Sequence, residues 1–192
     1  YGLRFPPDPG SANMCTIGGM VSNNSSGLRA IKYGVTRHYV LGMEVVLPTG
    51  EVIMTGGKDS RALKSVSGYD LAHLLIGSEG TLGIITKLRL KLMPRPPARG
   101  IDLCSFERLE QAGEAVNEVF RSGLLPSGIE MMDSNCIKAV NLMKPELNLP
   151  TDNEAILVFE VDGFQEEVSI QVNRLKQVVE KHAKYLQFSD EQ

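Results

Sequence analysis

The sequence predicts an α+β fold in which antiparallel sheets are backed by helices, and three observations lead to this class. Apolar segments at 40–47 and 51–54 flank Pro48-Thr49-Gly50. Because proline suits the second position of a turn and glycine the fourth, we expect a hairpin there. Residues 84–92 alternate between apolar and basic side chains, as in a strand with one solvated face. In the second half, strands and helices alternate without the long crossovers that parallel strands need.

The segment 10–27 precedes the hairpin and surrounds an adjacent glycine pair with uncharged hydroxyl and carboxamide side chains. Glycines let the backbone come close to a ligand, and its N–H groups can then point at an anion such as a phosphate. We therefore interpret Gly18-Gly19 as a tight turn that binds an anion. The alternative, that these glycines only shape a turn, stays open at this point.

Short elements complete the first half of the chain. Residues 56–60 are expected to form a loop, and residues 70–76 a short helix capped by Asp70 and stopped at Gly77. A second glycine-rich turn, 77–83, leads into the alternating strand. The apolar face of that strand is expected to comprise Ile84, Thr86, Leu88, Leu90 and Leu92.

A proline-rich stretch at 94–100 is stiff and donates few ladder hydrogen bonds, so we expect a domain boundary there. The chain then divides into domains 1–95 and 96–192. A helix near 134–143 is expected to be capped by Asp133 or Ser134. The other elements expected in the second domain are strands 101–104, 128–132, 155–161 and 185–188, and helices from about 106 to 121 and from 166 to about 183. The apolar stripes of these two helices are Leu109, Ala112, Val116, Val119 and Phe120, and Val168, Val172, Leu175, Val179 and His182.

Composition and charge narrow the function classes. The 192 residues carry a formal net charge of −3 with scattered lysines and arginines, so no nucleic-acid partner is expected. The three cysteines are far apart and odd in number, which fits neither a disulfide framework nor a metal site and favours a reducing compartment. No apolar run approaches the roughly 20 residues of a membrane-spanning helix, and no leader is evident. We expect a cytoplasmic protein with no transmembrane segment and no metal, and the opening at Tyr1 in a proline-rich loop predicts a piece of a longer protein.

Two common phosphate-binding motifs are absent from the sequence. It contains no G-x-x-x-x-G-K-[ST] loop, and no strand followed by G-x-G-x-x-G and a distant acidic residue. A P-loop hydrolase and a Rossmann dinucleotide fold are therefore disfavoured. What remains is an anion or dinucleotide held by neutral donors on two separate loops, at 10–27 and 77–83.

Several motifs, in their order and spacing, resemble one family. They are Pro7-Asp8-Pro9-Gly10-Ser11, the segment from Thr16 to Gly27, Tyr33-Gly34, the segment from Val45 to Gly50 and the segment from Gly77 to Thr86. Together they are similar to the FAD-linked oxidases of the vanillyl-alcohol-oxidase type, nearest to the branch of glycolate oxidase FAD subunits and D-lactate dehydrogenases. The resemblance is stronger in residues 1–95 than beyond them.

The resemblance implies that residues 1–95 are the C-terminal part of a PCMH-type FAD-binding domain and that residues 96–192 begin an antiparallel α+β cap domain for the substrate. It implies an FAD-dependent oxidoreductase that oxidises a small 2-hydroxy acid, of the glycolate or D-lactate type, by hydride transfer to the flavin. An iron–sulfur or other electron-transfer subunit is implied as partner. The catalytic base is not identified, and His38, His73 and His182 are interpreted as structural.

The resemblance also places the cofactor. Residues 10–19 are expected at the flavin and pyrophosphate, 23–26 add polar contacts, and 79–85 approach the adenosine side and the ribityl chain. Within the last segment, Ile84 and Ile85 are expected to form an apolar wall. The implied FAD-binding residues are Pro9, Gly10, Ser11, Thr16, Gly18, Gly19, Asn23, Asn24, Ser25, Ser26, Glu79, Gly80, Thr81, Leu82, Gly83, Ile84 and Ile85.

A second function from a different class competes with this one. Family members carry an earlier glycine-rich loop that also grips the pyrophosphate, and a larger cap domain that supplies catalytic residues; this sequence matches neither. The 192-residue piece is therefore expected to be inactive alone. The alternative is a catalytically silent scaffold that binds no FAD by itself and associates with the rest of its polypeptide or with a partner subunit.

Overall fold

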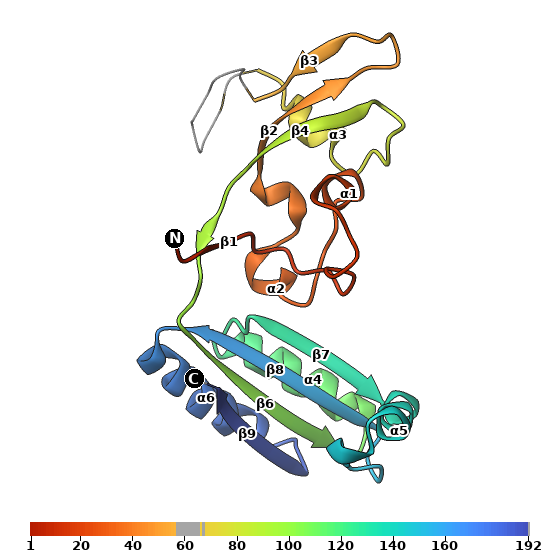
Figure 1. Ribbon diagram of the computed structural model, residues 1–192. Helices are drawn as coiled ribbons and strands as arrows, with labels where there is room; N and C mark the ends of the chain where they lie inside the picture. The colour runs from red at the N-terminus through yellow and green to blue at the C-terminus, as the bar shows by residue number, and fades with distance from the viewer. Residues whose placement is uncertain (57–65, 67, 192) are drawn as a thin grey trace. The chain divides into compact units, whose positions relative to one another are not determined.

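The computed structural model describes residues 1–56, 66 and 68–191, and it confirms the α+β class. The chain divides into two compact units, Tyr1–Arg95 and Pro96–Gln192, which Figure 1 shows in red to green and in green to blue. Each unit has its own sheet and its own apolar core. The two units are described separately below.

The first unit is built on a three-stranded antiparallel sheet with the order β3-β2-β4. The predicted hairpin is confirmed, because β2 pairs with β3 in the register Val46↔Val52. Two short helices cover one face of this sheet and contribute Val21 and Leu75 to a core that also contains the fully buried Val45. These elements are β2 (Val40–Val46), β3 (Val52–Met54), β4 (Ile84–Leu90), α1 (Ile17–Ser22) and α3 (Leu71–Leu75).

Several elements of the first unit are too short to leave a periodic signal in the sequence. They are β1 (Leu3–Arg4), which pairs with β5 (Met93–Pro94), the helix α2 (Ala30–Tyr33) and the 3₁₀-helix η1 (Thr36–Tyr39). Tyr39 ties this region together, because its hydroxyl donates to the Tyr33 carbonyl at 2.6 Å and its ring meets Phe5 edge-on. Of the predicted loop 56–60, residues 57–60 lie outside the described residues.

The predicted apolar face of the strand after residue 83 is wrong at both ends, because Leu92 lies beyond β4 and is 49% exposed, and the start of the strand faces the other way. The register of β4 against β2 shifts between Glu44↔Lys87 and Val45↔Ile85, so Thr86 is an extra residue in the ladder. A bulge of this kind reverses which side chains face the core. Leu88 and Leu90 pack on the core as predicted, but so does Ile85, whereas Ile84 is 63% exposed.

The second unit has a four-stranded antiparallel sheet with the order β7-β8-β6-β9 and two long helices on one face (Figure 1). This order and connectivity are those of a ferredoxin-like βαββαβ unit. A further helix and a 3₁₀ turn connect β7 to β8. The elements are β6 (Ala98–Phe106), α4 (Leu109–Arg121), β7 (Gly128–Asp133), α5 (Ser134–Met143), η2 (Pro145–Leu147), β8 (Ala155–Gly163), α6 (Gln165–Val179) and β9 (Tyr185–Glu191).

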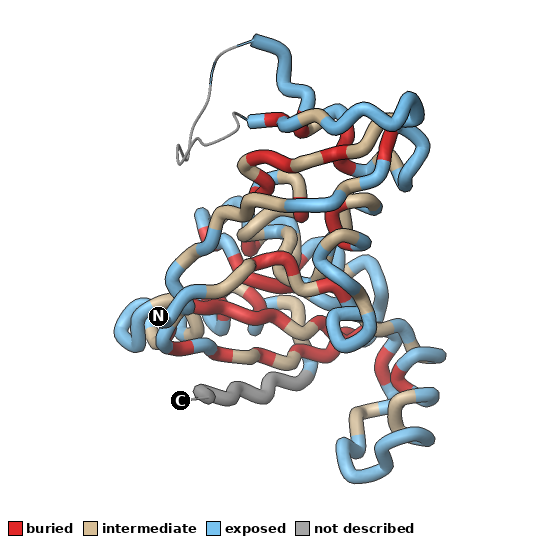
Figure 2. Tube along the Cα trace, turned by 45° about the horizontal axis from the view of Figure 1, so that its top comes forward, coloured by how far each residue is buried: buried red, intermediate tan, exposed pale blue. Residues whose placement is uncertain are grey.

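The core of the second unit lies between the sheet and helices α4 and α6. Phe106 and Phe159 from the strands and Val119 and Val179 from the helices have no exposed surface. In Figure 2 most residues of β8 and many of β6 are coloured as buried. At about 25 cal/mol per Å² of apolar surface removed from water, such a core is the main stabilising contribution of this unit.

Several boundaries of the predicted elements need correction in the second unit, and both β7 and β8 end one or two residues later than predicted. β6 begins at Ala98, so part of the proline-rich stretch 94–100 is already strand. Because Phe106 still belongs to β6, α4 begins only at Leu109. α6 ends at Val179, which leaves His182 beyond the helix, and β9 extends to Glu191. Of the two predicted caps of α5, Asp133 and Ser134, the structure has Asp133, so this prediction is confirmed.

Candidate cofactor site

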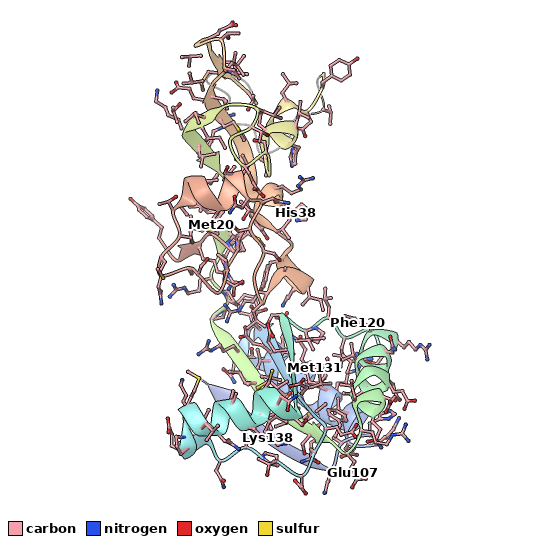
Figure 3. The ribbon with its side chains drawn as sticks, turned by 90° about the vertical axis from the view of Figure 1, so that its right-hand side faces the viewer. Met20, His38, Glu107, Phe120, Met131 and Lys138 are labelled. Atoms are coloured by element: carbon pink, nitrogen blue, oxygen red, sulfur yellow. The ribbon has the colours of Figure 1, made fainter. Side chains whose placement is uncertain are left out.

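The glycine pair Gly18-Gly19 forms the first turn of helix α1, so its interpretation as a tight turn is corrected. Thr16 has an extended backbone and caps the helix, with its Oγ1 accepting the Gly19 N–H at 3.0 Å. The N–H groups of Ile17 and Gly18 are the first of the helix and have no acceptor within it. No acidic residue stands in this turn, so its positive end suits an anion. Met20 marks α1 in Figure 3.

The glycines predicted to bind FAD differ in the space beside them, and at Gly19 an added Cβ would lie 3.2 Å from the capping Oγ1 of Thr16. At Gly10, Gly18 and Gly80 an added Cβ meets nothing within 4 Å. At Gly83 it would lie 2.6 Å from Val45 Cγ1 and 2.8 Å from the Val46 oxygen. Gly83 is therefore required by packing of its own unit, whereas Gly10, Gly18 and Gly80 leave open space beside the backbone.

The second glycine-rich segment, 77–83, binds directly to α1. The Gly77 N–H donates to the Val21 carbonyl and the Glu79 N–H to the Ser22 carbonyl, both at 3.1 Å. Glu79 and Gly80 both have positive φ, +50° and +79°, a conformation that is uncommon for a glutamate. The structure thus brings the two predicted segments together at opposite ends of one helix.

Residues 23–26, predicted to add polar contacts, also hold the protein together. Asn24 has φ +48°, and its Oδ1 accepts the Arg37 N–H at 2.9 Å. The Ser25 carbonyl accepts from both the N–H and the hydroxyl of Thr36, at 3.1 and 2.7 Å. This stretch therefore anchors η1 to the end of α1.

His73 adds a link between α3 and η1. Its Nε2 lies 3.0 Å from the Arg37 carbonyl and its Nδ1 lies 2.7 Å from Asp70 Oδ2. Both neighbouring atoms, a backbone carbonyl and a carboxylate oxygen, are hydrogen-bond acceptors. The hydrogen bond from His73 lowers the pKa of Asp70 below its usual range. The other two histidines are also engaged, His38 accepting the Val35 N–H at 3.2 Å and His182 lying 2.6 Å from Glu118.

Ile84 and Ile85 do not form the expected apolar wall. Successive residues of a strand point to opposite faces, and here Ile85 packs on the core while Ile84 is exposed. Leu82, at 42% exposure, is the nearest other apolar side chain of this segment on the surface. Of the two predicted wall residues, Ile84 is therefore the one on the surface, and Leu82 of the same segment is exposed as well.

Sequence reasoning missed the residues that hold the segment 9–16. Arg29 donates to Asp8 Oδ2 at 2.7 Å through its guanidinium and to Oδ1 at 3.3 Å through its backbone N–H. The Cα of Gly27 lies against the backbone of Asp8, where an added Cβ would collide with the Asp8 carbonyl. Opposite charges 21 positions apart give no periodic signal, so only Gly27, at the end of the polar stretch, hinted at a close approach.

The three cysteines differ in their surroundings. Burial raises the pKa of Cys104 to about 12, with Asp102 adding to the effect. Cys15 is half-buried and Cys136 is exposed. Among residues 1–56, 66 and 68–191, no three His, Cys, Asp or Glu side chains gather to hold a metal ion. Within the same described residues, no helix has the length and apolar character to cross a bilayer.

Models of known protein families match residues in both units. Residues 1–56 match the model of the FAD binding domain, and residues 95–190 match that of the FAD linked oxidases, C-terminal domain. The chain is 41% identical over 180 residues to glycolate oxidase subunit GlcD of Bacillus subtilis, covering 94% of this chain and 37% of that protein. It is 40% identical over 166 residues to D-lactate dehydrogenase of Archaeoglobus fulgidus, covering 86% and 36%.

The fold is also found in a solved structure. Alkyldihydroxyacetonephosphate synthase superposes with a TM-score of 0.77 at 23% identity, over 97% of this chain and 35% of that one. At this identity the likeness concerns the fold alone. The chain thus spans just over a third of the length of the relatives it matches.

Proposed function

The chain belongs to the FAD-linked oxidases, with FAD as cofactor, and from this premise we propose that the full-length protein oxidises a small 2-hydroxy acid of the glycolate or D-lactate type. The family and the cofactor were both predicted from the sequence, and both are confirmed. We assign residues 1–95 to the C-terminal part of the FAD-binding domain and residues 96–192 to the N-terminal part of the cap domain. The substrate class is supported by the names of two relatives, glycolate oxidase and D-lactate dehydrogenase.

The observation that carries the proposal is the joining of two glycine-rich segments through α1. The N–H groups of Ile17 and Gly18 point out of one end of the helix, and the segment at Gly77 and Glu79 is fixed to the other. Open space beside Gly10 and Gly18 leaves room for a ligand to approach the backbone. These residues fit an extended molecule with a diphosphate, as FAD is.

The roles follow from this geometry. Ile17 and Gly18 would donate to the diphosphate, residues 9–16 would line the flavin, and Glu79 and Ile84 would lie toward the other end of the cofactor. FAD supplies the acceptor for the hydride that leaves the α-carbon of the hydroxy acid. The base that removes the hydroxyl proton must lie within hydrogen-bond distance of it, and no side chain of this chain is assigned that task. An electron-transfer subunit as partner and a cytoplasmic location stay predictions.

Gly18→Val in the full-length protein tests the site. An added Cβ there meets nothing within 4 Å, and the branched side chain of valine covers the backbone that the diphosphate would approach, so we expect loss of the bound flavin while the protein remains folded. The wild type, mixed anaerobically with glycolate, D-lactate and other 2-hydroxy acids, should lose its oxidised-flavin absorbance with at least one of them. If Gly18→Val retains its flavin, the proposed cofactor site is wrong. If no 2-hydroxy acid bleaches the flavin, the proposed substrate class is wrong.

The alternative, a scaffold that is silent by itself, applies to the 192-residue piece and is favoured by one observation. Four strands and two helices of the second unit form its apolar core. We therefore expect the piece to fold without FAD. Titrating it with FAD and following flavin fluorescence separates the two cases. We expect no stoichiometric binding by the piece, and tight binding would contradict this expectation.

A further inference from the structure

The segment 9–16 has little packing of its own. Residues 10–14 are all exposed, and Met14 reaches 90% exposure. The hydrogen bonds inside the segment are local, from Ala12 N–H to the Pro9 carbonyl and from Cys15 N–H to the Ser11 carbonyl, at 2.8 and 2.9 Å. Such bonds fix the shape of the loop. Its position relative to the rest of the unit must come from its two ends.

One end runs into α1 through the Thr16 cap, and the other is held by Asp8. This carboxylate stands between the buried prolines Pro7 and Pro9. It accepts two hydrogen bonds from Arg29, one from the guanidinium and one from the backbone. Gly27 has no side chain, so the backbone at this residue can approach the backbone of Asp8 closely. Asp8, Gly27 and Arg29 are called the Asp8 clasp below.

The ion pair of the clasp differs from the surface pairs of the molecule. Both side chains of the clasp pair are shielded, with Arg29 21% and Asp8 26% exposed, whereas in the pair between Lys87 and Glu44 the glutamate is 20% exposed but the lysine is 72% exposed. Exposed pairs contribute little because water and salt screen them. A shielded carboxylate with two donors, one of them charged, makes stronger and more directional hydrogen bonds.

We propose that Asp8 and Arg29 are positioning residues for FAD: the clasp sets where the segment 9–16 presents its backbone to the flavin. This inference rests on the proposed function, because it needs that segment to line the cofactor. Neither residue touches FAD in this account. They act through Pro9 and Gly10, which follow Asp8 directly, and a displaced loop loses FAD affinity even though the domain stays folded.

Two variants of the full-length protein break the clasp by different routes. Arg29→Met removes the charge and the guanidinium donors but keeps the length of the side chain. Gly27→Ala keeps both charges and pushes the Asp8 backbone away. We expect each to raise the dissociation constant for FAD by about tenfold or more, the scale of one hydrogen bond to a charged group. We also expect each to change the visible circular dichroism of the flavin at saturating FAD.

Lys87→Met is the matched control, since it removes a 2.9 Å ion pair of the same unit that lies away from the segment. Its FAD affinity should stay within about twofold of the wild type, as expected for an exposed pair. Asp8→Asn is the milder variant, because it keeps an acceptor for the Arg29 N–H, and it decides the test if Arg29→Met fails to fold. Unfolding of each apoprotein is measured alongside.

A merely structural clasp would lower the unfolding midpoint and leave the FAD affinity and the flavin circular dichroism of the folded variants unchanged. That result for Arg29→Met, Gly27→Ala and Asp8→Asn would overturn the proposal. If Gly18→Val loses FAD while these variants keep it, only the clasp proposal fails. If Gly18→Val also keeps FAD, the proposed cofactor site at the start of α1 is contradicted, and the clasp proposal, which rests on that site, fails with it.

Discussion

The two units differ in the interactions that stabilise each of them internally. The second unit has helices of 13 and 15 residues over a sheet with a continuous apolar core. The first has helices of 6, 4 and 5 residues, fixed by polar contacts between side chain and backbone at Thr16, Asn24 and His73. Long amphipathic elements stabilise a scaffold, whereas backbone that must face a ligand cannot be buried and is held by directed hydrogen bonds instead.

Phe159→Ala is the strongest way to test the scaffold half of this comparison. The side chain is fully buried at the centre of the sheet, on β8, so its removal leaves a cavity and should cost about 3–5 kcal/mol. The unfolding free energy from denaturant titration measures the loss. Phe164→Ala, at a position 66% exposed, should cost far less, and an equal loss at both positions would show that burial does not govern this unit.

The pair Gly83→Ala and Gly18→Ala sharpens the contrast within the first unit. The methyl group at position 83 collides with Val45 and Val46, and overpacking of this kind costs about 1–3 kcal/mol. At position 18 it enters open space in a helix, where replacing glycine by alanine should stabilise the apoprotein by about 0.5–1 kcal/mol. Thermal unfolding of the two apoproteins measures both signs, and a stabilised Gly83→Ala would disprove the close approach.

The smallest expected effect concerns the cap of α5 in the second unit. The hydrogen bond from the Cys136 backbone N–H, at 2.7 Å, lowers the pKa of Asp133. A carboxyl with a lowered folded pKa stabilises the protein above its unfolded value of about 3.9, and this contribution disappears as the pH falls through the folded pKa. Asp133→Asn keeps a capping side chain that does not titrate. Its unfolding midpoint should therefore fall less than that of the wild type between neutral pH and about pH 3, and parallel curves would argue against the cap.

The sequence predicted the second unit well because its elements are periodic. Val168, Leu175 and Val179 of the predicted stripe are buried on α6, and Ala112 and Val119 on α4. Leu109 and Phe120 of the predicted α4 stripe are more exposed than predicted, at 45% and 39%. The errors lie at the ends of helices and strands, because contacts with neighbouring elements determine where an element ends.

The sequence predicted which two stretches form the candidate site. It did not predict the conformation of these stretches or the contacts that their residues make. Glycine content identified the stretches, but it did not distinguish the helical Gly18 from the packed Gly83. The bulge at Thr86 reversed the faces of Ile84 and Ile85, and a period of two cannot reveal an inserted residue. The contact of Asp8 with Arg29 depends on chain folding over 21 positions, which local patterns do not encode.

Helix α1 acts as a ruler between the two glycine-rich segments. Six residues of helix rise about 9 Å, and this length separates the amides of Ile17 and Gly18 from the carbonyls that hold Gly77 and Glu79. One inserted residue would add about 1.5 Å and turn one end by about 100° against the other. The distance between the two segments, and their relative orientation, therefore depend on the exact number of residues in α1. A change in the length of this helix would alter both more than a change of side chain would.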